Sequence, residues 1–296
     1  NAVRQIAVRN MFERNYYSLV AGLKEYALEA DNKGFDAREI IETIRCELSS
    51  GDRRTLELFY GSYDVANLIG LRSGKTNFSP LGNFSREELE QALEGKFRLP
   101  SYLADVVAAY ADPEGEEAER MDMTRPFERN LYESYYRACA ASKCRFLREW
   151  SDFDRTLRNV CAAYSARRSG VAPETVVVGH DDITDSLSRS SASDFGLKGE
   201  LEYLDDVVAA VSDERNLLEK ERKIDRIRWR MSDELAISNY FDMAAILSYL
   251  VKVNLVERWF SLDEATGRRL YDKLLTTLSG SELIDRAVVA EEKTEK

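Results

Sequence analysis

Apolar side chains recur every three or four residues along most of this chain of 296 residues, and this spacing allows few folds other than a helical one. In residues 151–168, for example, Phe153, Leu157 and Val160 fall on one face of a helix. One short segment, TVVVG (175–179), has the residue types of a strand and is too short to form a sheet alone. The pattern predicts an all-α protein built as a multi-helix bundle.

Local signals mark where several of the predicted helices begin. In SREELEQALEG (85–95), Ser85 and Glu88 have the spacing of a capping box, and Gly95 suits the end of the helix. DAREIIETIRCEL (36–48) opens in the same way. Further helices are predicted over residues 124–149, 151–168, 201–211, 224–235, 239–256 and 263–279.

The chain is predicted to form one all-α domain with a short extension at its N-terminus and a polar tail at its C-terminus. ADPEGEEAERMDMT (111–124) is acidic and poor in apolar side chains, and we expect an exposed loop there. The expected parts are an N-terminal extension (1–14), the domain (15–290) in two lobes (15–110 and 125–290) and a polar tail (291–296). Asn1-Ala2 looks like a cloning remnant, and Met11 is the expected start of the natural chain.

An aromatic residue followed by aspartate recurs at nearly constant spacing. The pairs are Tyr63-Asp64, Phe153-Asp154 and Phe241-Asp242, which are 90 and 88 residues apart. They suggest three similar helical units around a funnel or cleft, with each pair near the start of a corresponding helix. The same kind of pair also occurs outside this period, at Phe35-Asp36 and Tyr271-Asp272, so a chance recurrence stays open.

Charge and residue usage argue against several classes of function. Asp and Glu total 53 against 42 Lys and Arg, a net charge of −11, whereas proteins that hold nucleic acid need a basic surface. The single histidine, His180, excludes a histidine-rich metal site. The longest apolar stretch, residues 240–256, is shorter than a membrane span and carries Asp242 and Lys252. We therefore expect no cofactor, no nucleic-acid partner and no direct membrane insertion.

IGLRSGKT (69–76) ends like a phosphate-binding loop. In such a loop two glycines enclose four residues, and the loop leaves a strand and opens a helix. Here Gly70 and Gly74 enclose only three residues, and the flanking segments do not have that order. We interpret the glycines as the end of a helix and Lys75 as a solvated turn residue.

GHDDITDSL (179–187) is the most enzyme-like stretch. An adjacent His and Asp on a helical scaffold resembles the HD-type metal phosphohydrolases, although their metals need a further histidine that this chain lacks. One hypothesis is therefore a metal-dependent phosphohydrolase that uses His180, Asp181 and Asp182. In the interpretation that we favour, Asp181 or Asp182 caps a helix beginning near Ile183, and His180 lies in the preceding turn.

EKERKIDRIRWR (219–230) concentrates basic residues in an otherwise acidic chain. Arg222, Arg226 and Arg230 share one helix face and form a candidate protein-binding surface. Glu219 and Asp225 lie in the same segment and are spaced for ion pairs, which favours a solvated, paired face instead. Both interpretations stay open.

Seven motifs, spread over nearly the whole chain from Asn15 onward, together resemble one uncharacterised bacterial family. They are NYYSLVAGL (15–23), LFYGSYDVANL (58–68), LGNF (81–84), WSDFDRTLRNVCAAYSARR (150–168), SSASDFGL (190–197), EKERKIDRIRW (219–229) and VERWFSLD (256–263). Members of that family are typically encoded among the subunits of V/A-type ATPases and have no established activity. The resemblance therefore transfers no catalytic residue to this chain.

What the resemblance implies is a setting. It makes V/A-type ATPase subunits the expected partners and the cytoplasm the expected location, at the membrane only through the ATPase complex. We expect a non-catalytic component or an assembly and coupling factor. The most specific version of this expectation is an adaptor like the one in the central stalk of rotary ATPases. That adaptor is an all-α funnel of three similar units that joins the rotor shaft to the membrane ring. The alternatives are the phosphohydrolase and a free-standing helical regulator that binds a small ligand. The oligomeric state is left open.

Overall fold

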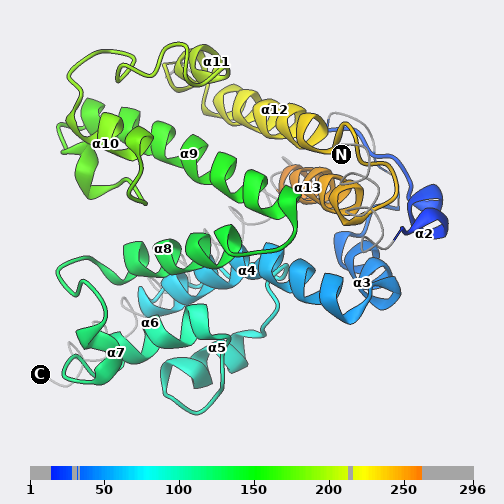
Figure 1. The fold of residues 1–296 in the computed structure, drawn as a ribbon, viewed down its shortest axis with the longest axis horizontal. Coiled ribbons are helices and arrows are strands. Elements are labelled where there is room, and N and C mark those ends of the chain that lie inside the picture. Colours follow the sequence, from blue (N-terminus) through cyan, green and yellow to red (C-terminus); the bar gives the residue numbers. More distant parts are fainter. Residues whose placement is uncertain (1–14, 29–31, 33, 213–215, 262–296) are drawn as a thin grey trace, which may run out of the picture. The chain divides into compact units, whose positions relative to one another are not determined.

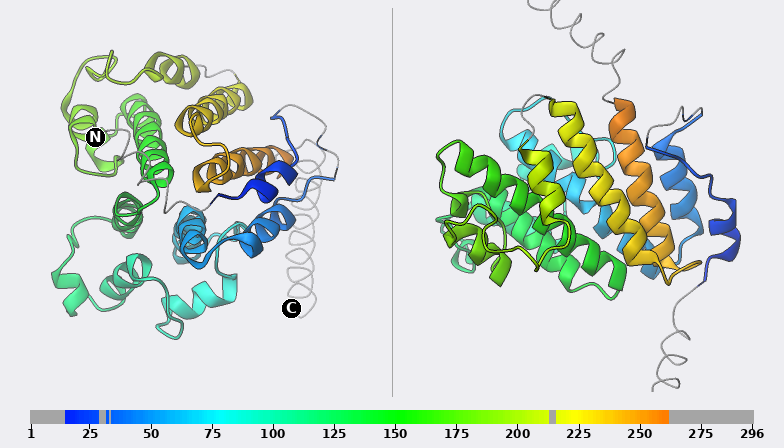
Figure 2. Two further views of the ribbon diagram at one scale, coloured as in Figure 1. Left: turned by 45° about the vertical axis from the view of Figure 1, so that its right-hand side comes forward. Right: turned by 90° about the horizontal axis from the view of Figure 1, so that it is seen from above.

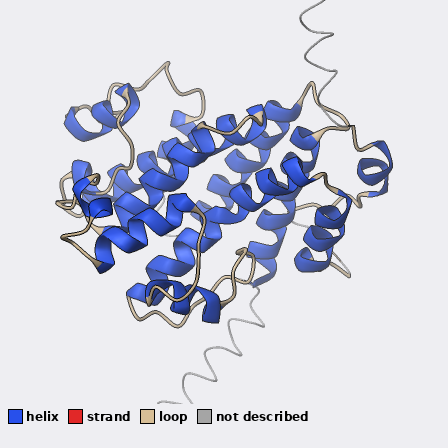
Figure 3. Ribbon diagram, turned by 60° about the horizontal axis from the view of Figure 1, so that its bottom comes forward, coloured by secondary structure: helices blue, strands red, loops and turns tan. Residues whose placement is uncertain are grey.

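The computed structural model describes residues 15–28, 32, 34–212 and 216–261. All regular structure in these residues is helical, with no strand among them (Figure 3), so the prediction of an all-α bundle is confirmed. The strand expected at 175–179 is wrong: η1 (Pro173–Thr175) forms one 3-10 turn there, and the described residues offer no second strand to pair with it. No helix of the described residues combines the length and the apolar character needed to cross a membrane.

The helices in chain order are α2 (Tyr17–Gly22), α3 (Ala37–Glu47), α4 (Ser50–Arg72), α5 (Arg86–Leu93), α6 (Ser101–Ala111), α7 (Glu116–Glu119), α8 (Phe127–Ala140), α9 (Arg145–Arg168), α10 (Asp182–Arg189), α11 (Leu204–Val211), α12 (Leu217–Ala236) and α13 (Met243–Ser261). Helix α7 is a single turn within the acidic segment 111–124. Four predictions lie outside the described residues: the extension 1–14 with Met11, the helix 263–279, the pair Tyr271-Asp272 and the tail 291–296.

The chain divides into two compact units. The first comprises residues 1–24 and 38–251, and the second comprises residues 25–37 and 252–296. In the described part of the second unit, the ring of Phe35 lies 4.9 Å from that of Tyr26 and 5.5 Å from that of Phe260, measured between centroids. These three aromatic rings form its small apolar cluster.

The single helix predicted over residues 124–149 is interrupted between α8 and α9. The hydroxyl of Ser142 accepts the N–H of Cys144 at 3.2 Å, and Arg148 Nη1 donates to the carbonyl of Ser142 at 2.7 Å. These local bonds give the backbone an alternative to the helix. The single-helix prediction is wrong, and α9 begins at Arg145 rather than at residue 151.

Within the first unit, one arrangement of helices occurs twice (Figure 1). A long helix, α4 with 23 residues or α9 with 24, is followed by an eight-residue helix, α5 or α10. The last helix of each group, α8 or α12, packs against the long helix and also against the third helix of its group, α6 or α11. Figure 2 shows α12 running alongside α9 in the second group. Because α8 also packs against α9, the two groups are joined.

The second group encloses the apolar stripe that the sequence predicts in residues 151–168. Phe153, Leu157 and Val160 are buried in one cluster with side chains of α11 and α12, among them Val207 and Ile227. Burial of this kind stabilises a helix far more than its intrinsic propensity does. The stripe therefore determines which face of α9 points inward.

Each long helix holds the loop that follows it through one buried asparagine. The amide of Asn67 donates to the carbonyl of Ser79 at 2.9 Å and accepts its N–H at 2.8 Å. Asn159 binds Val178 in the same way, at 2.7 and 2.9 Å. An asparagine amide satisfies both backbone groups of one loop residue because it carries a donor and an acceptor.

The residues IGLRSGKT form the end of α4, as interpreted from the sequence. The N–H of Lys75 donates to the carbonyl of Gly70 at 2.9 Å, and that of Gly74 donates to Leu71 at 3.0 Å. With Gly74 at φ 70°, this is a Schellman motif, for which glycine is the favoured residue. Helix α9 ends in the same Arg-Ser-Gly sequence, with Gly170 at φ 68°.

The aromatic-Asp pairs do not occupy equivalent positions. Asp64 and Asp154 lie inside α4 and α9, whereas Asp242 precedes α13 and accepts the N–H groups of its first turn at 3.0 and 3.1 Å. The predicted equivalence of the three pairs is wrong. The corresponding residues are Asn67 and Asn159, and α9 extends one helical turn further beyond its asparagine than α4 does. A search for constant spacing therefore misses them.

Asp64 is fully buried and holds the loop before α5. Its carboxylate accepts the N–H of Asn83 at 2.8 Å, the amide of the same residue at 2.6 Å and the N–H of Phe84 at 3.3 Å. Gly82 must be glycine here, because a Cβ would lie 2.5 Å from Asp64 Oδ1. Burial raises the pKa of Asp64 from 3.8 to about 6, although these hydrogen bonds lower it.

We predict that Asp64 makes the stability of the protein depend on pH. Its carboxyl binds a proton more tightly in the folded state, so the free energy of unfolding falls as the pH rises from about 4 to about 6 and is level above that range. Asp64→Asn removes this dependence. The difference in unfolding free energy between the two proteins should change by up to about 3 kcal/mol over that window, measured by urea denaturation. Parallel pH curves for both proteins would contradict the prediction.

A second prediction concerns Lys75, which is exposed beyond the end of α4. Lys75→Ala should change the free energy of unfolding by no more than about 0.5 kcal/mol, because the motif uses only the backbone of this residue. Calorimetric titration of the unchanged protein with Mg-ATP should show no saturable binding. Micromolar binding that disappears in the variant would instead establish a nucleotide site at this turn.

Candidate functional site

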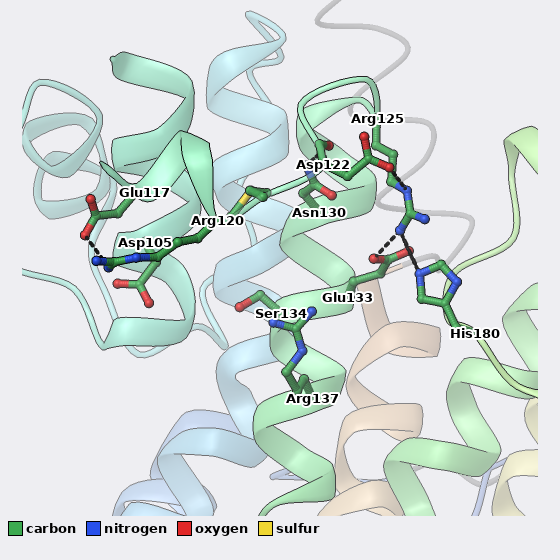
Figure 4. A pocket seen from close by; sticks show the side chains of 11 residues that line it. Asp105, Glu117, Arg120, Asp122, Arg125, Asn130, Glu133, Ser134, Arg137 and His180 are labelled. Carbon is green, nitrogen blue, oxygen red and sulfur yellow. Dashed lines mark hydrogen bonds and ion pairs between the residues drawn. The ribbon is translucent and has the colours of Figure 1, made fainter. Parts of the chain in front are cut away.

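Two adjoining cavities lie along α8 in the first unit. One, of about 380 Å³, is lined by residues from α6 to α8 and by His180, which Figure 4 shows facing Arg125. The other, of about 400 Å³, lies between α8, α9 and the loop before α10. Glu133, Arg137 and His180 line both cavities, so the walls meet at these three side chains.

The loop that carries His180 is fixed by α9. Asn159 holds Val178 through two hydrogen bonds, and the next residue, Gly179, has φ 114°. This conformation favours glycine because other side chains rarely adopt it, and a Cβ at Gly179 would also collide with Arg155 Nη1. The long helix thereby places His180 and Asp181 against α8 and α9.

Glu133 is the charged centre of the shared wall. Its carboxylate lies 2.7 Å from Arg125 Nη1 and 3.2 Å from Arg129 Nε, and its side chain is only 9% exposed. Arg125 also donates to His180 Nε2 at 2.7 Å. The same His180 Nε2 lies 3.6 Å from Glu133 Oε1. The group is a closed ion-pair network that orders the loop.

Asp181 caps α10, as the favoured interpretation of GHDDITDSL states. Its Oδ1 accepts the N–H and the hydroxyl of Thr184, both at 2.8 Å, and its Oδ2 lies 2.5 Å from Arg155 Nη2. Burial opposes ionisation, but the bonds from Thr184 and Arg155 hold the pKa of Asp181 below its usual value. Asp182 is exposed in the first turn of α10.

The phosphohydrolase hypothesis gains no support from this geometry. Asp181 is engaged by Thr184 and Arg155, and His180 by Arg125. Among the residues that the structure describes, no three His, Cys, Asp or Glu side chains gather closely enough to hold a metal ion. The loop therefore brings His180 and Asp181 into one region without forming a set of ligands.

Of the three arginines proposed as a protein-binding surface, Arg226 and Arg230 are exposed and Arg222 is half-buried, and all three have acidic neighbours. Arg222 and Arg226 lie 4.0 and 3.3 Å from the carboxylate of Glu219, and Arg230 lies 3.0 Å from that of Asp206. Exposed pairs of this kind contribute little to stability. The pairing agrees with a solvated face, and binding of a partner there stays a prediction.

The same basic segment supplies an interaction that the sequence reasoning missed. Arg228 Nε lies 3.2 Å from Asp154 on α9, and its Nη1 lies 2.9 Å from Asp225, whose side chain is fully buried. The pair with Asp154 ties α12 to α9, and the pair with Asp225 lies within α12. The neighbouring Ile224 and Ile227 do not mark Asp225 as buried, because residues one and two apart on a helix point in different directions.

The capping role of Asp181 can be tested against its neighbour. Asp181→Ala should lower the free energy of unfolding at pH 7 by about 1–2 kcal/mol, because it removes the cap of α10 and one partner of Arg155. The matched control, Asp182→Ala, should change it by no more than about 0.5 kcal/mol. Urea denaturation measures both. Equal losses in the two variants, or a bound divalent metal that both variants release, would contradict the capping interpretation.

Comparison with known proteins bears on the whole chain rather than on the cavities. No curated protein matches it in sequence. The profile of one protein family matches residues 13–281, a range that contains every helix described above and all seven motifs. The chain therefore belongs to the family described as "Protein of unknown function (DUF2764)".

Proposed function

We propose that the chain is a non-catalytic component, or an assembly and coupling factor, of a V/A-type ATPase. The setting comes from the family resemblance in the seven sequence motifs. The observation that carries the proposal is how the polar residues of those motifs are used. They bind other parts of the same chain and so build a scaffold.

The motif LFYGSYDVANL supplies Asp64 and Asn67, which hold the loop after α4. WSDFDRTLRNVCAAYSARR supplies Asp154 and Asn159, which bind α12 and the loop before α10. EKERKIDRIRW supplies Arg228, the partner of Asp154. In this chain the polar residues of the motifs fix the positions of helices and loops, as an adaptor between subunits requires.

The repeated arrangement of helices supports the sharper form of the proposal, a role like that of the central-stalk adaptor. That adaptor consists of three similar helical units, and the groups α4–α8 and α9–α12 are two similar units in this chain. The aromatic-Asp repeat no longer supports this form. The asparagine clamps and the matching ends of α4 and α9 take its place.

The proposal can be tested by purifying the tagged protein from its native cells in mild detergent and identifying its partners by mass spectrometry. ATPase subunits in stoichiometric yield would identify a permanent component, and lower yield an assembly factor. If Arg222, Arg226 and Arg230 form the docking surface, replacing all three by Gln should reduce the yield of these subunits at least about fivefold.

A matched control removes the same charge elsewhere. Arg120, Arg145 and Arg189 are exposed and also pair with carboxylates on their own helices. Replacing these three by Gln should leave the yield unchanged. Absence of every ATPase subunit from the purified unchanged protein would refute the proposed function. Equal yields from both triple variants would exclude only the arginine surface.

A further inference from the structure

The cavity between α8 and α9 is lined by two arginines that form no ion pair with the described residues. The cavity measures about 400 Å³, a volume suited to a small molecule. Arg137 enters it from α8 and Arg148 from α9. The electrostatic balance around these two side chains indicates what the cavity binds.

Arg137 lies four residues after Glu133, the spacing at which a helix forms Glu–Arg pairs. Glu133, however, lies against Arg125 and Arg129, at 2.7 and 3.2 Å. Among the described residues, the side chain of Arg137 makes no hydrogen bond and no ion pair, and it is exposed. Its charge is therefore not compensated by this part of the protein.

Arg148, on the facing helix, also lacks a carboxylate partner among the described residues. Asp152, four residues later, lies 2.6 Å from Arg155, which also holds Asp181. Arg148 donates one N–H to the carbonyl of Ser142 at 2.7 Å, and no carboxylate of the described residues lies within ion-pair distance of it. This single bond anchors the half-buried guanidinium and leaves most of its five N–H donors without acceptors in the described part of the protein.

Two uncompensated arginines in one cavity are unusual in a chain with a net charge of −11. A partly buried charge is stabilised by an opposite charge, and the planar guanidinium matches the oxygens of phosphate and carboxylate groups. The acidic side chains of the cavity wall cannot supply that charge, because each already faces at least one other arginine. An anion from outside the chain can.

We propose that this cavity binds a small anion, whose phosphate or carboxylate group is held between Arg137 and Arg148. The site is independent of the proposed ATPase partnership. Because Arg137 and Arg148 come from different helical groups, a small metabolite bound there contacts both groups at their junction.

The test uses the full chain and isothermal titration calorimetry at constant ionic strength. Three probes separate the chemical classes: inorganic phosphate, pyrophosphate and citrate. We expect at least one of them to bind once per chain. Replacing Arg137 and Arg148 together by Gln should weaken that binding at least about tenfold. The preferred probe tells whether the site takes a phosphate or a polycarboxylate.

Arg145→Gln is the matched control. Arg145 lies on the same helix as Arg148, is 75% exposed and pairs with Glu149, and it does not line the cavity. The affinity of this variant for the probe should stay within about twofold of the unchanged protein. If the double variant does not fold, Arg137→Gln alone carries the test, because that side chain has no partner in the described structure to lose.

Three outcomes would overturn the proposal. The first is that none of the probes binds the unchanged protein with a dissociation constant below about 10 mM. The second is that the variants lacking Arg137 or both arginines bind as well as the unchanged protein. The third is that Arg145→Gln weakens binding as much as they do, which would show general attraction of the anion to positive charge. None of these outcomes bears on whether ATPase subunits co-purify.

Discussion

Long loops in an all-helical protein leave backbone N–H and C=O groups that no sheet can satisfy, and this constraint organises the first unit. Asn67 and Asn159, on the two long helices, satisfy some of these groups. Each side chain pairs with the N–H and the C=O of a single loop residue. Asp64 adds an acceptor for two further N–H groups. The loops are consequently attached to the helices at defined points.

The position of the cavities follows from one of these attachments. Because Asn159 holds Val178, the next three residues lie against α8 and α9, where Asp181 meets Arg155 and His180 meets Arg125. Local ion pairs occupy much of this wall, because Arg129 lies four residues from Glu133 and Arg155 lies three residues from Asp152. Two further arginines of the second cavity are left without a carboxylate partner among the described residues.

Ion pairs act differently in different parts of the molecule. On the exposed face of α12 they involve Arg222, Arg226 and Arg230 and contribute little to stability, which leaves this face available for a partner. Between α12 and α9, Arg228 is largely buried with Asp154 and Asp225, and removing one member of such a group leaves a charge without compensation. These buried residues are therefore expected to tolerate little change.

Consecutive residues were enough to establish the helical class, the inward face of α9 and the signals at helix ends, such as the cap at Asp181 and the glycine turn at Gly74, because each depends on side chains within about one helical turn. The polar residues that shape the candidate site took their roles only once the helices had packed. Asn159 and Val178 are 19 residues apart, and Arg228 and Asp154 are 74 apart. Each such pairing joins groups that are far apart in sequence, so the spacing of neighbouring residues does not predict it.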